Sequence, residues 1–138
     1  MTPMKLTAAE ANRLICEKVF GWRWESYGNG GGFWHRDGCE KRQRSSSCKC
    51  GGLWYTPDYL SDPAASKALM NKLAQMENCH LELWVFSTHA ECAIAKEVPA
   101  DPFGTIESVV ADASGDTLER AVALCAFASL GLDVEIGE

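Results

Sequence analysis

One short stretch of the sequence, from Phe33 to Tyr55, gathers residue types that bind metal ions. It reads FWHRDGCEKRQRSSSCKCGGLWY and holds one of the three His and three of the seven Cys. Structural zinc is held by four Cys or His ligands in a tetrahedron, and a polar loop that cannot fold alone gains most from such a clamp. The candidate ligands are His35, Cys39, Cys48 and Cys50. Their spacing differs from that of standard zinc fingers, so free thiols and a disulfide stay open beside structural zinc.

The same loop is basic and is flanked by tryptophans. It carries five basic and two acidic side chains, a net of +3, which leaves −9 for the rest of a chain whose total is −6. Such charge separation can guide a surface to phosphate, RNA or an acidic protein face. We therefore expect a partner-binding surface made of Trp34, Arg36, Lys41, Arg42, Arg44, Lys49 and Trp54. A solvated hairpin tip without a partner is the plainer alternative.

Catalysis is a weaker reading of this loop. Nucleophilic catalysis needs a Cys or Ser beside a His base that a third group holds in place. Cys39 and His35 have the required residue types, but nothing in the sequence sets their geometry. No pair of carboxylates stands out for acid–base chemistry either. The sequence therefore predicts no catalytic residues and no enzyme.

Composition indicates one globular domain, residues 1–138, with a Gly-, Cys- and Lys/Arg-rich hairpin extension at about 28–52. The chain is 46% apolar and 23% charged, and its net charge of −6 argues against wholesale nucleic-acid binding. No apolar run reaches the roughly 18 residues of a membrane helix. The N-terminal segment lacks the hydrophobic core of a secretory signal, so we expect a cytoplasmic protein with reduced thiols.

The four cysteines outside the loop fall within apolar patterns. There a thiol acts as a small hydrophobic group rather than as a ligand or nucleophile. They are Cys16, Cys79, Cys92 and Cys125. We expect them to pack in the core.

Two helices have clear signals at both ends. Thr7 and Glu10 form a capping box before the first helix, and Gly21 is expected to end it. Asp116 is expected to cap the last helix, which Gly131 ends in a left-handed conformation. Apolar residues recur at helical spacing between these signals.

The second helix begins at a proline. Ser61 or Asp62 is expected to cap it, and Pro63 suits its first turn, where a missing amide costs nothing. Its apolar stripe predicts an end near Asn78.

Strands are predicted between these helices. Residues 33–35 begin a strand, and residues 52–55 return antiparallel to it. A hairpin covers residues 80–96, Val98 and Pro99 break the pattern, and residues 106–111 favour a strand over a helix.

The order of the elements predicts an α+β domain with three helices packed on a mostly antiparallel sheet. Residues 81–86 carry apolar side chains on both faces, which suggests a central strand covered on two sides. Residues 132–136 alternate as an edge strand. We find no internal repeat and no domain linker.

The chain resembles the phage ABA sandwich family of small phage and prophage proteins. The residues that carry the resemblance are Glu17–Trp22, Trp54–Tyr59, Ser61–Ala65 and Ala121–Ala128. The resemblance implies a layered helix–sheet–helix fold and a phage origin, and it brings no catalytic residues. Residues 28–51 depart from the family pattern as an expansion of a plainer hairpin.

Together these features predict a small phage-encoded, non-enzymatic binding protein in the cytoplasm of a bacterial host cell. The leading hypothesis is an inhibitor of a host defence system, of the anti-CRISPR type, that acts by surface contact with a host protein. One alternative is a sponge that sequesters a nucleotide immune signal in a pocket at a homo-oligomer interface. The other is a zinc-stabilised module that binds nucleic acid. No membrane partner is expected.

Overall fold

The structure is a computed structural model that describes residues 3–26, 28, 31–36, 52–76, 78–99, 102 and 104–137. These residues form three helices and seven strands, which confirms the α+β class. The helices are α1 (Ala8–Lys18), α2 (Pro63–Ala74) and α3 (Leu118–Ser129). The strands are β1 (Met4–Leu6), β2 (Arg23–Ser26), β3 (Gly32–His35), β4 (Cys79–Val85), β5 (Ala90–Pro99), β6 (Thr105–Gly115) and β7 (Val134–Ile136).

The described strands form three separate small sheets. The largest has the order β4-β5-β6 and is antiparallel, β2 pairs antiparallel with β3, and β1 pairs parallel with β7. The strand expected at residues 106–111 is confirmed as part of β6. Pro99 was expected to break the pattern but ends β5, opposite Thr105. It is tolerated because β4 pairs with β5 only as far as Lys96, so the proline lies on an edge.

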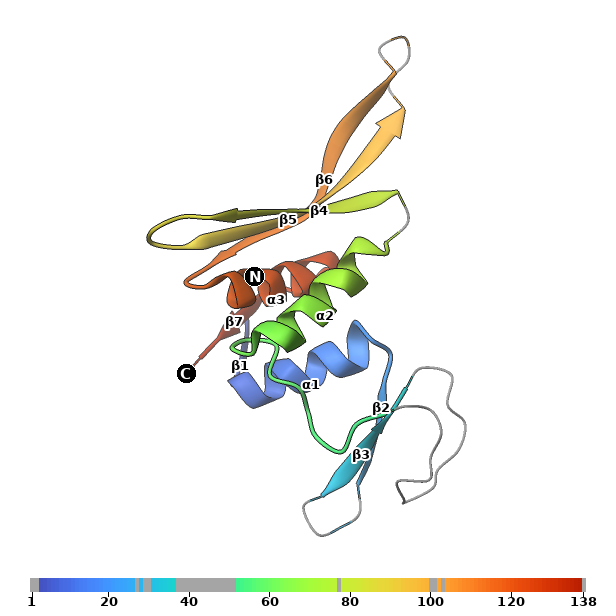
Figure 1. Cartoon of the computed structure of the whole chain (residues 1–138), viewed down its shortest axis with the longest axis vertical. Helices are drawn as coiled ribbons and strands as arrows, with labels where there is room; N and C mark the ends of the chain where they lie inside the picture. Colours follow the sequence, from blue (N-terminus) through green and yellow to red (C-terminus); the bar gives the residue numbers. More distant parts are fainter. Residues whose placement is uncertain are drawn as a thin grey trace.

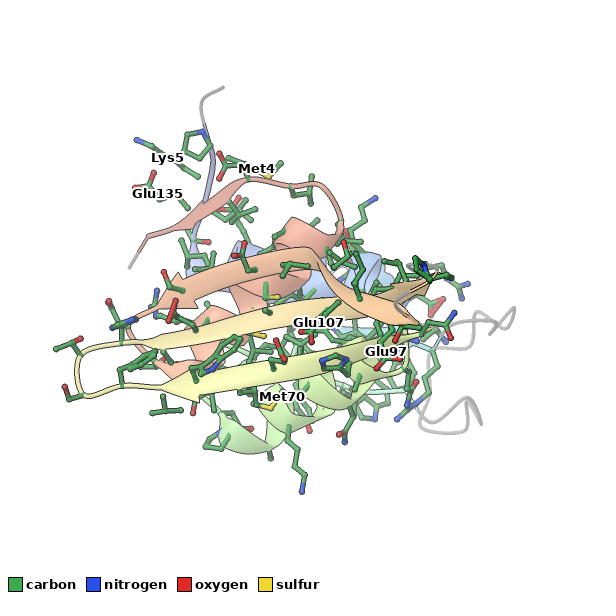
Figure 2. The ribbon with its side chains drawn as sticks, turned by 90° about the horizontal axis from the view of Figure 1, so that it is seen from above. Met4, Lys5, Met70, Glu97, Glu107 and Glu135 are labelled. Atoms are coloured by element: carbon green, nitrogen blue, oxygen red, sulfur yellow. The ribbon has the colours of Figure 1, made fainter. Side chains whose placement is uncertain are left out.

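The expected helix–sheet–helix layering is not confirmed. Figure 1 shows all three helices on one side of β4-β5-β6, between that sheet and the β2-β3 hairpin. β4 is an edge strand and β5 the central one, so the expectation of a central strand at residues 81–86 is wrong. No described helix covers the opposite face of β4-β5-β6, which Figure 2 views from above.

The capping box of α1 is confirmed. The Thr7 amide donates to Glu10 Oε1 at 3.0 Å, and the Glu10 amide donates to Thr7 Oγ1 at 3.2 Å. Two of the otherwise unpaired amides at the helix start are satisfied in this way.

The cap of α2 is Asp62, whose carboxylate accepts from the Ala64 amide at 3.1 Å. The helix ends at Ala74, four residues before the expected end near Asn78. Asn78 has a φ of 58°, a left-handed conformation that no helix interior accepts.

α3 begins one residue later than expected. Thr117, and not Asp116, is the N-cap, and its hydroxyl accepts from the Arg120 amide at 3.2 Å. Both residues are good caps, so only the extended backbone of Thr117 decides between them. Gly131 ends the helix at a φ of 75°, as expected.

The core lies where α2 and α3 pack on the inner face of β4-β5-β6 and extends past α1 to the β2-β3 hairpin. Cys16, Cys92 and Cys125 are fully buried in it, and Cys79 is half-buried. Within the described part of the chain, no helix is long and apolar enough to cross a membrane.

Candidate functional site

The C-terminal end of α1 starts a cluster of aromatic side chains. Gly21, at a φ of 71°, ends the helix, and the Trp22 amide donates to the Cys16 carbonyl at 2.9 Å. This turn places the Phe20 ring 4.9 Å from the Trp22 ring and in a stack 5.6 Å from the Tyr59 ring. Three rings from two chain segments therefore meet at one end of α1.

The β2-β3 hairpin contributes a further pair of aromatic rings. Trp24 lies opposite Trp34 in the strand register, and the two indole rings are 5.1 Å apart. The Arg13 guanidinium lies over both, 5.3 Å from Trp24 and 5.6 Å from Trp34. Gly32 is required here, because a Cβ would collide with the Trp24 indole. The hairpin is thus pinned to α1 by cation–π contacts.

Residues 52–62 run past α1 to the start of α2 and close the cluster (Figure 1). Leu53 pairs with Trp34 through two backbone hydrogen bonds of 2.7 and 3.1 Å, which confirms the expected antiparallel return. The buried Asn12 amide accepts from the Tyr59 backbone amide at 2.9 Å and donates to Asp58 Oδ1 at 3.3 Å. A side chain of α1 therefore holds the position of Tyr59.

The described thiol that contacts this cluster, that of Cys16, is an unreactive one. Cys16 Sγ lies 3.6 Å from the Tyr59 hydroxyl, and both groups are buried. Burial raises the pKa of Cys16 to about 11 and also raises the pKa of Tyr59. Both groups are therefore neutral at physiological pH, and Cys16 is no thiolate nucleophile.

A pocket of about 320 Å³ opens between this cluster and α2. Its aromatic lining comes from Phe20, Trp22, Tyr55 and Tyr59, and its charged groups are Arg36 and Asp62. The Arg36 guanidinium lies 5.6 Å over the Trp22 ring at the rim. An adjoining hollow of the same volume shares Arg36 and adds Lys72 from α2. The pair can accept a planar or apolar group next to a negative charge.

The described residues of the predicted partner surface fall into two groups. Trp34 is fully buried, and its indole donates to the Thr56 hydroxyl at 2.9 Å, so its described surroundings are packing contacts. Arg36 is exposed and Trp54 is 48% exposed, packed edge-on against Phe33. The remaining predicted residues lie outside the described residues: Lys41, Arg42, Arg44 and Lys49.

Only one of the four predicted zinc ligands is described. His35 is fully buried, with Nε2 3.6 Å from Glu25 Oε2 and its ring 5.0 Å from the Phe33 ring. Cys39, Cys48 and Cys50 lie outside the described residues. The zinc loop therefore stays a prediction.

A different metal-capable group, absent from the sequence prediction, lies on the outer face of the large sheet. His80 Nε2 is 3.4 Å from Glu82 Oε1 and 3.7 Å from Glu107 Oε1. All three ligand atoms lie within 4.8 Å of one another, and imidazole with carboxylates is a common donor set for divalent ions. The alternation of His80 and Glu82 signals a shared face, but Glu107 comes from β6, which only the strand register brings near (Figure 2).

The sequence also gave no sign of the pocket. Phe20, Trp22, Tyr55 and Tyr59 each have an ordinary packing interpretation, and they come from two segments that are far apart in the sequence. Their convergence depends on how residues 52–62 pack against α1 and its C-terminal turn.

Comparisons with known proteins found no relative. No protein-family model, curated protein or solved structure matches the chain. The resemblance to the phage ABA sandwich family therefore stays a prediction made from the sequence.

Proposed function

We propose that this chain is a small phage-encoded, non-enzymatic binding protein that inhibits a host defence system by surface contact. The observation that carries the proposal is the 320 Å³ pocket that Tyr55 and Arg36 line, together with the exposed Trp54 next to Tyr55 in the chain. Trp54 is 48% and Tyr55 63% exposed. Trp, Tyr and Arg are the residue types most enriched at protein–protein hot spots, where an anchor from one partner fills a pocket on the other.

The chemistry of the described reactive groups supports binding over catalysis. Burial raises the pKa of Cys16, whereas the hydrogen bond between Cys92 and Cys125 raises the pKa of Cys92 and lowers that of Cys125, and both of these thiols are fully buried. Within the described residues, His35 lies against the carboxylate of Glu25, and His80 lies against those of Glu82 and Glu107. A nucleophile with a base would need the opposite arrangement.

One described contact does pair a hydroxyl with an imidazole. Thr88 Oγ1 lies 3.0 Å from His89 Nδ1, and His89 Nε2 lies 3.8 Å from Glu91 Oε2. Thr88 and His89 are adjacent on the exposed turn between β4 and β5, where water competes for every hydrogen bond. A catalytic triad works in a sheltered site with oxyanion donors, so we read this contact as a turn-stabilising one.

A nucleotide-binding function is the second candidate, favoured by the same pocket. Nucleobases stack on aromatic rings, and Arg36 and Lys72 would attract phosphate. This second candidate corresponds to the sponge that sequesters a nucleotide immune signal. Its ligand would be a nucleotide, whereas the ligand of the first candidate is a host protein.

Substitutions at the pocket rim test the two candidates. Tyr55→Ala and Arg36→Ala should each weaken the affinity for the captured host protein more than tenfold, which corresponds to about 1.4 kcal/mol, because each removes a hot-spot group. Leu130→Ala, at an apolar residue that is 41% exposed and directly follows α3, should leave affinity unchanged. The measurement is capture from bacterial host lysate followed by titration with the purified partner.

A partner captured equally by all four proteins would contradict the protein-binding proposal. Mass spectrometry of the denatured wild-type protein examines the second candidate. A nucleotide retained by the wild type and by Leu130→Ala, but lost from Arg36→Ala, would replace the first candidate by the second.

Structural zinc held by His35, Cys39, Cys48 and Cys50 remains part of the proposal. Metal analysis of the untagged protein should find about one equivalent, which Cys48→Ser loses and His80→Ala keeps, because a thiolate ligand set binds zinc more tightly than one imidazole with two carboxylates. Metal-free wild-type protein would remove zinc from the proposal. Loss in His80→Ala alone would place the ion at the His80 group instead.

A further inference from the structure

The outer face of β4-β5-β6 is a sheet face without a described layer over it (Figure 2). Core residues such as Cys92 and Ile94 point to the helices, so the intervening residues of each strand point outward. In the register, Ala93 lies between Glu82 of β4 and Asp112 of β6. The middle of this outer face is therefore an alanine with a longer side chain on each side.

A groove of about 490 Å³ follows from this arrangement of small and large side chains. Ala93 contributes to its floor, Trp84 and Phe86 line it from the β4 side, and Val109 lines it from β6. Trp84 is 44%, Phe86 48% and Val109 58% exposed. These apolar surfaces are open to a partner, and apolar patches on a sheet face mark docking sites.

The charges in the groove are all of one sign. Glu82, Glu91 and Asp112 line it, and no Lys or Arg of the described chain does. Glu107 lies beside it through His80. The imidazoles of His80 and His89 lie at the edge of the groove, 3.4 Å from Glu82 Oε1 and 3.8 Å from Glu91 Oε2. A second copy of this face would bring carboxylates against carboxylates, so the charges oppose self-association.

We propose that this groove docks a protein partner through an arginine or lysine side chain presented by an extended segment. The aliphatic stem fits against Val109 and the Trp84 ring, and the cationic head meets Glu82 and Asp112. Aromatic faces and carboxylates attract the same cation, by cation–π contact and by charge-assisted hydrogen bonds. This surface lies at the opposite end of the molecule from the β2-β3 hairpin and needs no part of the proposed pocket (Figure 1).

Peptide titration of the full chain tests the proposal. The probe is acetyl-Arg-Ala-Arg-Ala-Arg-amide, in which alternate arginines share one face of an extended strand. The same peptide with glutamine in place of arginine is the neutral reference. We expect the arginine peptide to bind at least tenfold more tightly than the glutamine peptide, with an affinity that falls as salt is added.

Two groove variants and one matched control complete the test. The double variant Glu82→Gln, Asp112→Asn and the single variant Trp84→Ala should each weaken binding of the arginine peptide at least tenfold. The control Asp133→Asn, Glu135→Gln removes the same charge from exposed residues at β7 and should bind like the wild type. Circular dichroism melting curves check that every variant folds, and NMR of the indole amides locates the peptide if Trp84→Ala is unstable.

Three outcomes would overturn the proposal. The first is equal binding of the glutamine peptide, and the second is equal weakening in the groove variants and the β7 control. The third is a dimer in sedimentation that Trp84→Ala dissociates, because the occupant would then be a second copy.

Discussion

Replacing Trp34 with alanine should lower the free energy of unfolding by about 3–5 kcal/mol, the usual cost of deleting a buried aromatic ring. Trp34 is fully buried, packs 5.1 Å from the Trp24 ring and lies under the Arg13 guanidinium. Its indole also donates to Thr56, which would lose its partner. For a domain whose total stability is about 5–15 kcal/mol, this loss threatens folding itself.

Trp54→Ala is the matched control for this experiment. It deletes the same side chain from a residue that is 48% exposed, so we expect a loss of about 1 kcal/mol or less. Urea unfolding followed by circular dichroism measures both. If Trp34→Ala lost as little stability as Trp54→Ala is expected to lose, the β2-β3 hairpin would contribute little to the stability of the core.

Gly52→Ala should cost about 3 kcal/mol, at the upper end of the range for overpacking. A Cβ at this residue would collide with the backbone carbonyl oxygen of Trp34 and with the Phe33 ring. The backbone cannot turn away as a side chain can, and the two hydrogen bonds between Trp34 and Leu53 hold it in place. The added methyl group must therefore separate the two segments.

Gly137→Ala is the control for the glycine substitution. Its Cβ would lie 3.8 Å from the Leu6 carbonyl oxygen, an ordinary van der Waals contact, and its φ is outside the left-handed region. We expect its unfolding free energy within about 0.5 kcal/mol of the wild type. If Gly52→Ala matched this control, residues 52–53 would not be anchored on β3.

The two proposed surfaces differ in chemistry as well as in place. The pocket near Arg36 combines aromatic rings with positive charge, whereas the sheet groove combines aromatic rings with carboxylates. A chain with both could hold an acidic and a basic partner at once. The peptide titration and the lysate capture examine the surfaces separately, since each uses variants that leave the other surface unchanged.

Signals that act within one or two helical turns were predicted well from the sequence. The capping box of Thr7 and Glu10, the ends of helices at Gly21 and Gly131, and the antiparallel return at Leu53 are all confirmed. The capping box and the two helix ends depend on neighbouring residues, so the sequence contains most of the relevant energy, whereas Leu53 pairs with Trp34, 19 residues earlier in the chain. The α3 cap was misplaced by one residue, because Asp116 and Thr117 have similar capping energies.

By itself, the sequence determined the α+β class, the three helices with most of their ends, and the burial of three of the four cysteines in apolar patterns. Only the tertiary structure decided which faces are covered. Trp84 and Phe86 suggested a second buried face of β4, yet they are exposed. Apolar alternation shows that a face can be buried, and it cannot show whether a helix of the same chain or another molecule buries it. The pocket and the His80 group could not be predicted either. Their side chains meet only through packing and strand register between segments that are far apart in the sequence.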